Sequence, residues 1–420
     1  MAATVASTPS VTDLALAAKA AARRLAAVDP ATKDAALLAI ADALEARLPE
    51  ILAANALDLS AGRQSGLSSA LMDRLTLDEA RVRGIADGTR AIAALPDPVG
   101  EVVSGGRLAN GLDFRKVRVP LGVIAVVYEA RPNVTIDAAA LCLKSGNAVL
   151  LRGSSSAVHS NEVLARIAGE AASAAGLPEG ALTLVGGGRE ALTELAQLEG
   201  VVDLIIPRGG EGLKKAISAV ARVPVIYAAA GNCHVYVDAS ADLEMATRII
   251  VNAKVQRPGV CNAAETLLVH SSVASAFLPG ALEELRSRGV ELRGDERVAA
   301  LASVAPASES DWAEEFLALI LAVRVVDSVD EAIDHINRYG TGHSEAIVTR
   351  DRDAARAFQL GIDSACIYVN ASTRFTDGGE FGMGAEIGNS TQKLHARGPI
   401  GLRELCSTRY LVDGEGQVRG

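Results

Sequence analysis

The chain has 420 residues, of which 49% are hydrophobic and 22% are charged, and its formal net charge is −10. This length predicts two or three domains with ample sequence for a large core, and this composition is ordinary for a globular protein. The acidic balance argues against a nucleic acid or an anionic membrane as the main partner, and no run of 18 apolar residues predicts a membrane span.

Residues 1–27 lack the basic start and the apolar core of a secretory signal. Their Ala- and Arg-rich amphipathic pattern is also compatible with an organelle transit peptide, but Asp13 and the continuing helical pattern favour a folded helix. The five cysteines are odd in number, widely spaced and free of any C-x-x-C motif, which predicts reduced thiols and a cytoplasmic protein. The six histidines form no H-x-x-x-H or His/Cys cluster, so the sequence predicts no metal site.

Residues 11–98 are predicted to be rich in helix, with Asp29-Pro30 ending one helix and starting the next. Glycine and proline residues at 95–106 mark the end of this helix-rich region. The stretch RLANGLDFRKVRVP, residues 107–120, places an Asn-Gly turn among alternating residues, which predicts a β-hairpin.

From residue 121 onward, short apolar runs alternate with helical patterns, which is typical of a parallel sheet covered on both faces. The fold class is therefore α/β. The predicted strands are 122–128, 147–153, 181–187, 201–207 and 223–228, with helices near 134–145, 157–175, 188–198 and 211–222.

Ligands of such sheets usually bind at the carboxyl ends of the strands. Four of these ends contain YEARPN, LLRGSSS, LVGGGRE and IPRGGEG. None matches the G-x-G-x-x-G pattern, but all four carry an arginine and three of them contain glycine. Backbone amides of this kind bind phosphate, so the pattern favours a nucleotide or another phosphate ligand.

A second α/β unit is predicted from about residue 234, and it includes the strand-like run ETLLVH and the segment DEAIDHINRYGTGHSEAIV at 330–348. Residues 372–399 form a long Gly-rich stretch with arginine and histidine but without periodicity. Stretches of this kind are usually functional or disordered. The apolar Phe375, Phe381 and Met383 favour order.

Cys261 follows a break between two regular patterns. DLEMATRIIVNAKV predicts a helix, AETLLVH predicts a strand, and Pro258-Gly259 forces a turn between them. A lone cysteine is usually a small buried residue. We expect this of Cys142, Cys366 and Cys406. At a junction between elements, with Arg257 nearby, Cys261 is either such a residue or a reactive thiolate, and the local sequence leaves both interpretations open.

Four sequence blocks together closely resemble the γ-glutamyl phosphate reductases, a family within the aldehyde dehydrogenase superfamily. They are GVIAVVYEARPNVTIDAAALCLKSGNAVLLRG, VQRPGVCNAAETLLVH, VDSVDEAIDHINRYGTGHSEAIV and STRFTDGGEFGMGAEIG, in the order of the family. The resemblance covers essentially the whole chain, and the block from Ala332 to Ile347 is particular to this family. It implies an aldehyde-dehydrogenase-like fold with a Rossmann-type cofactor domain, an α/β catalytic domain and a small oligomerisation arm.

The same resemblance implies the domain boundaries and the partners. The NADPH-binding domain is expected at 1–105 and 120–232, the catalytic domain at 233–375, and the oligomerisation hairpin and C-terminal tail at 106–119 and 376–420. A homodimer or homotetramer is expected, in which the arm adds strands to a partner's sheet. The glutamate 5-kinase that makes the substrate is expected to be a separate polypeptide and a candidate partner.

Enzymes of this family reduce L-glutamate 5-phosphate with NADPH to L-glutamate 5-semialdehyde and phosphate, the second step of proline biosynthesis from glutamate. By this resemblance Cys261 is the nucleophile and forms a thioester. Asn133 matches the superfamily asparagine whose amide donates to the oxyanion, together with the backbone N–H of Cys261. The local sequence alone favours a plain turn residue after Pro132 at this position.

The resemblance also carries over the cofactor residues. Arg152 stands where relatives have a lysine that contacts the adenosine ribose, and Ser154 follows it closely. Ser155 stands where NAD-selective relatives have a glutamate that repels a 2′-phosphate, so NADPH is the expected cofactor. Gly209 and Gly210 correspond to the turn and helix start beside the pyrophosphate, where relatives more often have Gly-Ser.

Glu315 matches the carboxylate that holds the nicotinamide ribose, and its alternative interpretation is a solvated charge on a helix. The substrate pocket must hold a phosphate and an α-carboxylate. Its cationic candidates are Arg131, Arg257, Arg374, His395 and Arg397. Ala228 stands where oxidising relatives have a glutamate that activates water, so hydrolysis of the thioester is not expected.

Two competing interpretations exist. Another enzyme of the superfamily, an NAD-dependent aldehyde oxidiser or a CoA-acylating reductase, also uses the cysteine, but the YGTGHSE and TRFTDGGEFG blocks favour the glutamyl phosphate enzyme. The second competing interpretation is a catalytically silent scaffold with the same fold. The presence of Cys261, Asn133 and Glu315 counts against this interpretation.

Overall fold

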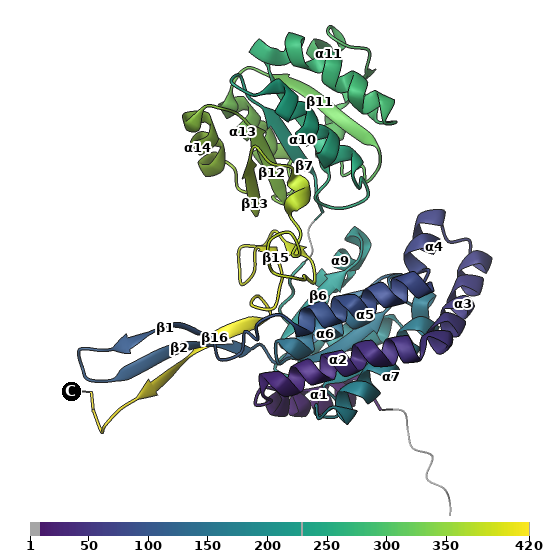
Figure 1. Ribbon diagram of the computed structural model, residues 1–420, viewed down its shortest axis with the longest axis vertical. Helices are drawn as coiled ribbons and strands as arrows, with labels where there is room; N and C mark the ends of the chain where they lie inside the picture. The colour runs from purple at the N-terminus through teal and green to yellow at the C-terminus, as the bar shows by residue number, and fades with distance from the viewer. Residues whose placement is uncertain (1–8, 228–229, 420) are drawn as a thin grey trace, which may run out of the picture. The chain divides into compact units, whose positions relative to one another are not determined.

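The computed structural model describes residues 9–227 and 230–419, without the side chains of Ala70 and Glu211. The chain forms two compact units, drawn in Figure 1. The first comprises Met1–Tyr227, Met383–Gly388 and Ile400–Gly420, and the second comprises Ala228–Gly382 and Asn389–Pro399. Residues 376–420 are thus divided between the two units, whereas the sequence placed them in one tail. The functional roles of these regions stay predictions.

Helices form the N-terminal part of the first unit, as the sequence predicted for residues 11–98. They are α1 (Val11–Leu25), α2 (Pro30–Ala46), α3 (Leu48–Gln64), α4 (Ser69–Leu75) and α5 (Glu79–Ala93). The Asp29 carboxylate caps α2 by accepting the Thr32 N–H at 3.0 Å. Pro30 lies in the first turn of α2, where its missing N–H costs no helical hydrogen bond.

A four-stranded parallel sheet forms the core of the first unit, in the order β5-β4-β3-β6. The strands are β3 (Val123–Tyr128), β4 (Ala148–Gly153), β5 (Leu182–Leu184) and β6 (Leu204–Arg208). They alternate with α6 (Asn133–Lys144), η1 (Ser155–Ala157), α7 (Val158–Ala174), α8 (Arg189–Gln197) and α9 (Glu211–Ser218). Every residue of β3 is buried, as expected of a central parallel strand covered on both faces.

The predicted strand at 223–228 is wrong in extent. Within the described residues it consists of one isolated bridge between Val225 and Ile205. The Pro224 carbonyl accepts the Ile205 N–H at 2.9 Å, and the Ile226 N–H donates to the Ile205 carbonyl at 3.0 Å. Because Pro224 has no N–H of its own, it cannot extend a regular ladder in this segment.

A three-stranded antiparallel sheet, which we call the arm, consists of β1 (Val102–Arg107), β2 (Asp113–Pro120) and β16 (Cys406–Asp413). Figure 1 shows it as an extended ribbon. The predicted hairpin is present: β1 and β2 are joined through Asn110-Gly111, and Gly111 has a positive φ of 84°. An Asn-Gly pair suits this turn because glycine adopts positive φ at no steric cost.

A seven-stranded parallel sheet forms the core of the second unit, in the order β10-β9-β11-β8-β7-β12-β13. Its strands are β7 (Cys233–Val237), β8 (Ala264–His270), β9 (Glu291–Gly294), β10 (Ala305–Pro306), β11 (Ile320–Val326), β12 (Ser344–Val348) and β13 (Cys366–Val369). The intervening elements are α10 (Leu243–Val255), α11 (Ser271–Ser287), α12 (Glu296–Ala299), η2 (Glu309–Ala313), α13 (Val329–Tyr339) and α14 (Arg352–Gly361).

Successive side chains of the central strand β7 enter two different cores. Val235 and Val237 pack in a cluster with residues of α10 and α11. Tyr236, between them, packs in a cluster with residues of α13 and α14, and its ring stacks on Phe358 at 6.3 Å. Side chains alternate across a strand, so a strand covered on both faces is mostly apolar, and the buried polar His234 of β7 is hydrogen-bonded to Glu345 at 3.0 Å. This is the α/β fold that the sequence predicted.

The Gly-rich stretch 372–399 contains short regular elements: η3 (Thr373–Phe375), β14 (Asn389–Ser390) and β15 (Gly398–Pro399). Thr373 and Thr376 are buried within it. Among the described residues, no helix combines the length and the apolar character that crossing a membrane requires.

Candidate active site

Cys261 lies between the end of α10 and the start of β8, as the sequence predicted. It is half-buried, whereas the other four cysteines, all of them described, are buried. Burial raises the pKa of the Cys142 and Cys233 thiols, and it raises that of Cys406 to about 12. Because thiolates are the reactive form, these residues are poor nucleophiles, and Cys261 has the most suitable setting of the five.

The main chain of Cys261 is held by the segment that leads into β7. The Cys233 thiol donates to the Cys261 carbonyl at 3.2 Å. Gly231 packs against the same carbonyl so closely that a Cβ atom at this position would lie 1.4 Å from its oxygen. Only glycine fits here, because any side chain would displace the nucleophile's own backbone.

Glu315 is joined to this point of the chain. Its Oε1 accepts the Gly231 N–H at 2.6 Å. The pKa of Glu315 is raised, mainly by burial, while the hydrogen bond from Gly231 opposes the rise. Glu315 lies in an irregular segment between η2 and β11, so the alternative of a solvated charge on a helix is wrong.

Two of the predicted substrate-binding arginines belong to segments that adjoin Cys261: Arg257 precedes it by four residues, and the Arg374 carbonyl accepts from the side chain of Asn262 at 3.3 Å. Arg374, in η3, donates from Nε to the Gln256 side-chain oxygen at 2.8 Å. Burial lowers the pKa of Arg374, and the charge of Arg257 lowers it further, whereas Asp377 and the Cys261 thiolate raise it. Arg257, Cys261 and Arg374 all belong to the second unit. Cationic side chains in the neighbourhood of a thiol attract an anionic substrate.

The remaining cationic candidates are placed differently. In the second unit, Arg397 donates to Asp363 at 2.8 Å, and Lys393 donates to the other oxygen of the same carboxylate at 2.6 Å. His395 is exposed and has a positive φ of 70°. Arg131 belongs to the first unit, just before α6, and is half-buried. The assignment of these three residues to the substrate stays a prediction.

Asn133 is the first residue of α6, not a plain turn residue. Its side-chain Nδ2 donates to Asp137 Oδ2 at 2.8 Å. Burial raises the pKa of Asp137 to about 6, although the Asn133 hydrogen bond and the charge of Arg208 act to lower it. Sequence reasoning missed Asp137. The signal was its spacing, since residues i and i+4 share one face of a helix.

The predicted pyrophosphate turn lies between β6 and α9. A Cβ atom on Gly209 would lie 2.7 Å from both the Glu129 Cδ and a methyl carbon of Leu213, so a side chain at this position would require the ends of these two side chains to move. The Gly210 N–H, at the start of α9, donates to the Glu129 carboxylate at 3.0 Å. This amide thus already binds an anionic oxygen, which is the property that pyrophosphate binding requires.

The residues predicted to contact the adenosine ribose follow β4. Arg152 donates from one terminal nitrogen to the carbonyls of Gly187, at 3.2 Å, and Gly188. Its Nε is buried and has no hydrogen-bond partner among the described residues. Ser154 and Ser156 share a hydrogen bond of 2.6 Å, and Ser155 is exposed at the start of η1.

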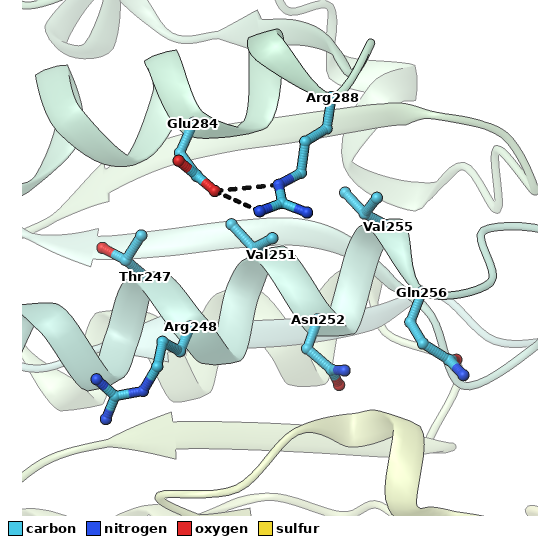
Figure 2. A pocket seen from close by; sticks show the side chains of 8 residues that line it. All are labelled: Thr247, Arg248, Val251, Asn252, Val255, Gln256, Glu284 and Arg288. Carbon is cyan, nitrogen blue, oxygen red and sulfur yellow. Dashed lines mark hydrogen bonds and ion pairs between the residues drawn. The ribbon is translucent and has the colours of Figure 1, made fainter.

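A separate groove of about 400 Å³ lies on the surface of α10 and α11 (Figure 2). Arg288 donates to the Glu284 carboxylate across the upper side of this groove, at 2.6 and 3.0 Å. The groove ends at Gln256, the residue that accepts from Arg374. Its lining residues are Thr247, Arg248, Val251, Asn252, Val255, Gln256, Glu284 and Arg288.

Comparison with known proteins places this geometry in a family. The sequence model that describes the aldehyde dehydrogenase family matches residues 2–311 and 299–409 of this chain. The gamma-glutamyl phosphate reductase of Moorella thermoacetica is 58% identical over 404 residues, which cover 96% of this chain and 97% of the relative. The enzyme of the same name from Thermobifida fusca shows the same identity and coverage. The chain belongs to the gamma-glutamyl phosphate reductase family of aldehyde dehydrogenases.

Solved structures agree with this family assignment. The crystal structure of gamma-glutamyl phosphate reductase from Thermotoga maritima superposes with a TM-score of 0.96 at 46% identity, and it covers 98% of this chain and 100% of that one. An acetylating aldehyde dehydrogenase from Geobacillus thermoglucosidasius, at 19% identity and a TM-score of 0.69, shares the fold. Aldehyde dehydrogenases use a nicotinamide cofactor. The assignment of individual residues to this cofactor stays a prediction. Ala228, the position of the missing base, lies outside the described residues.

Proposed function

We propose that this protein reduces L-glutamate 5-phosphate to L-glutamate 5-semialdehyde and phosphate, the second step of proline biosynthesis from glutamate, and that NADPH is its cofactor. As a member of this family it is an oxidoreductase, and its relatives at 58% identity are named for this reaction. The observation that carries the proposal is the half-buried Cys261, whose next residue, Asn262, is hydrogen-bonded to the turn that contains Arg374 and which follows Arg257 by four residues. An acyl phosphate is an anionic electrophile, and this arrangement suits it.

The residues of the chain account for the covalent steps. The Cys261 thiolate attacks the acyl carbon, the bond from this carbon to the phosphate oxygen breaks, and a thioester and free phosphate result. The Asn133 amide and the Cys261 backbone N–H are proposed to donate to the oxyanion of each tetrahedral species. Arg257 and Arg374 are proposed to hold the phosphate before it leaves. Arg131, His395 and Arg397 are weaker proposals for the substrate's charged groups.

When bound, a nicotinamide cofactor would supply the hydride that reduces the thioester carbon. The Cys261 thiolate would then leave, and the aldehyde would be released. The chain fits such a cofactor at three points. The buried Nε of Arg152 has no partner among the described residues, Gly209 keeps the turn before α9 free of a side chain, and the Gly210 N–H already binds an anionic oxygen. Glu315, held by Gly231, is proposed to bind the nicotinamide ribose.

The preference for NADPH is proposed from the residues that follow β4. Arg152, Ser154 and Ser155 can donate to a 2′-phosphate, and none of them is acidic. A homodimer or homotetramer formed through the arm, a cytoplasmic location and an association with a separate glutamate 5-kinase are proposed on the same family resemblance. Exposed apolar residues of the arm, including Val102, Val103 and Val412, suit burial against another chain.

The function is tested by mixing the purified protein with NADPH and freshly generated L-glutamate 5-phosphate. Oxidation of NADPH, followed at its absorbance band, with formation of the semialdehyde is the expected result. Because the substrate is labile, the acyl phosphate is made in the same vessel by a glutamate kinase, and a reaction without that kinase is the control. Absence of kinase-dependent NADPH oxidation would refute the proposed function.

A further inference from the structure

Asn262, the residue after the nucleophile, is buried against the turn that carries Arg374. Its exposed fraction is 4%. Its Nδ2 donates to the carbonyls of Thr376, at 2.9 Å, and Arg374, at 3.3 Å. In return, the Thr373 hydroxyl donates to the main-chain carbonyl of Asn262 at 2.7 Å. The peptide that follows Cys261 and the turn 373–376 are thus joined by bonds in both directions.

The turn 373–376 is also fixed from the side of the sheet. The Thr376 hydroxyl shares hydrogen bonds with Ser344, at 2.6 Å, and with Tyr368, at 2.8 Å. Ser344 in turn bonds to His343 Nδ1 at 2.8 Å. Ser344 begins β12 and Tyr368 lies in β13, so the turn is attached to two neighbouring strands. The GHSE sequence at 342–345 therefore contributes a support for this turn.

These attachments matter for Arg374 because they join its turn, including the Arg374 carbonyl itself, to the residue that follows Cys261. The charge of Arg374 is also coupled electrostatically to Cys261 and to Arg257. Two like charges repel, so their approach needs a backbone that holds them in place. At 2.7 Å, the Thr373–Asn262 bond is the shortest of the three hydrogen bonds that join the turn to Asn262. Its loss would leave the buried Asn262 carbonyl without this donor, which costs free energy and favours displacement of the turn.

We propose that Thr373 and Asn262 are positioning residues that hold Arg374 beside the Cys261 thiol and thereby give this thiol its preference for anionic acylating groups. The identity of the acyl donor, an acyl phosphate, rests on the proposed function, but the electrostatic coupling between the turn and the thiol does not. Neither residue needs to touch the substrate, because each acts through the position of Arg374.

The test compares Thr373→Val with Thr373→Ser. Valine has nearly the shape of threonine but lacks the hydroxyl, whereas serine keeps the hydroxyl and lacks the methyl group. The rate of alkylation of Cys261 is measured with iodoacetate, an anion, and with iodoacetamide, its neutral analogue, by mass spectrometry of the peptide. A change in the thiol's ionisation alters both rates together, so the ratio of the two rates reports the local positive potential.

We expect Thr373→Val to lower the iodoacetate-to-iodoacetamide ratio by about threefold or more, as Arg374→Gln does, and Thr373→Ser to keep the ratio of the unmodified protein. In the reverse reaction, Thr373→Val should raise the KM for inorganic phosphate and leave the KM for NADP⁺ unchanged. An unchanged ratio in a folded Thr373→Val protein would overturn the proposal. An equal fall in Thr373→Ser would overturn it as well, because the methyl group would then carry the effect.

Asn262→Ala provides the same test if Thr373→Val does not fold, since it removes the two bonds from Nδ2 and leaves the threonine in place. A lowered ratio in this variant supports the proposal, and an unchanged one contradicts it. The alkylation assay contains no glutamyl phosphate. Failure of the proposed reaction therefore appears as missing NADPH oxidation, whereas failure of this proposal appears in the alkylation ratio.

Discussion

The side-chain amide of Asn133 donates a hydrogen bond of 2.8 Å to the carboxylate of Asp137, one turn further along α6. A side-chain amide has two N–H groups, so one remains for the oxyanion while the other fixes the orientation of the group. Asp137 thus acts as an anchor for the proposed oxyanion donor. This relationship yields the first two predictions.

Asp137→Ala should lower kcat by about tenfold, and Asn133→Ala by about a hundredfold, because only the second removes the oxyanion donor itself. The double variant should be no slower than Asn133→Ala alone, since Asp137 acts through Asn133 and the two effects are not additive. Steady-state kinetics of the three proteins decide the matter. If the decrease in kcat of the double variant equals the product of the two single decreases, Asp137 has a role that is independent of Asn133.

The raised pKa of Asp137 predicts a dependence of stability on pH. In the folded state burial raises this pKa to about 6, above the ordinary value of 3.8. Between these values the folded protein holds a proton that the unfolded chain has lost, so this group's contribution to stability is greatest at low pH and is lost as pH rises through 6. The limiting slope is about 1.4 kcal/mol per pH unit.

Asp137→Asn should remove this dependence. The difference in free energy of unfolding between the variant and the unmodified protein should therefore shift in favour of the variant as pH rises from 4.5 to 7. Denaturant unfolding followed at several pH values measures it. A difference that is constant over this range would contradict the raised pKa.

Cys261→Ala should abolish turnover, because neither the methyl group nor water replaces a thiolate that forms the thioester. Cys142→Ala and Cys366→Ala should keep the chemistry, since both residues are buried and belong to the packing. Their expected cost is in stability, of about 1 kcal/mol. Steady-state rates of the folded variants, with their melting temperatures as the control, test this prediction. Normal activity of Cys261→Ala would remove the mechanism.

Ser155→Glu should weaken the use of NADPH by about tenfold and affect NADH much less. Ser155 is exposed at the start of η1, and a carboxylate there would repel a 2′-phosphate while Arg152 still attracts it. The measurement is kcat/KM for both cofactors, with Ser155→Ala as the neutral control. Equal use of both cofactors by the unmodified protein would count against the proposed preference.

In reverse, the protein should oxidise the semialdehyde in a sustained way only when inorganic phosphate is present. The sequence has Ala228 where oxidising relatives have a base, and general-base help to water is worth roughly 10²–10⁴-fold. The appearance of NADPH from semialdehyde and NADP⁺ is followed with and without phosphate. Glutamyl phosphate or its cyclised product should be the first product. Steady turnover without phosphate would implicate another base, such as Glu265, whose pKa burial raises to about 7.

Glu265 is already held by two interactions that a catalytic base would have to give up. Its carboxylate is buried in an ion pair with Lys254 at 2.5 Å, and its second oxygen accepts the Leu317 N–H at 3.1 Å. A group held in this way is a structural ion pair of the second unit. Lys254→Met would leave the Glu265 charge without its cation and should be strongly destabilising.

Local features of the sequence determined the elements of this protein. The Pro258-Gly259 turn follows α10 and leads to Cys261, and the apolar runs became parallel strands because a strand buried on both faces has few polar positions. Where a local rule was overridden, the cause is visible: Pro224 lacks the N–H that a regular strand at 223–228 would need. The family was also evident in the sequence, because its blocks are contiguous stretches of residues.

The tertiary structure alone decided which side chains meet. Arg374 bonds to Gln256 from a position 118 residues away, and Gly231 must be glycine because the Cys261 carbonyl lies against it. Neither relationship has a signature in spacing, since hydrophobic periodicity and turn preferences act over a few residues. The path of the chain through the sheet order β8-β7-β12-β13 brings these segments together, and that path is set by packing of the whole second unit. The contacts that hold the segment around Cys261 in place are therefore determined by the tertiary structure.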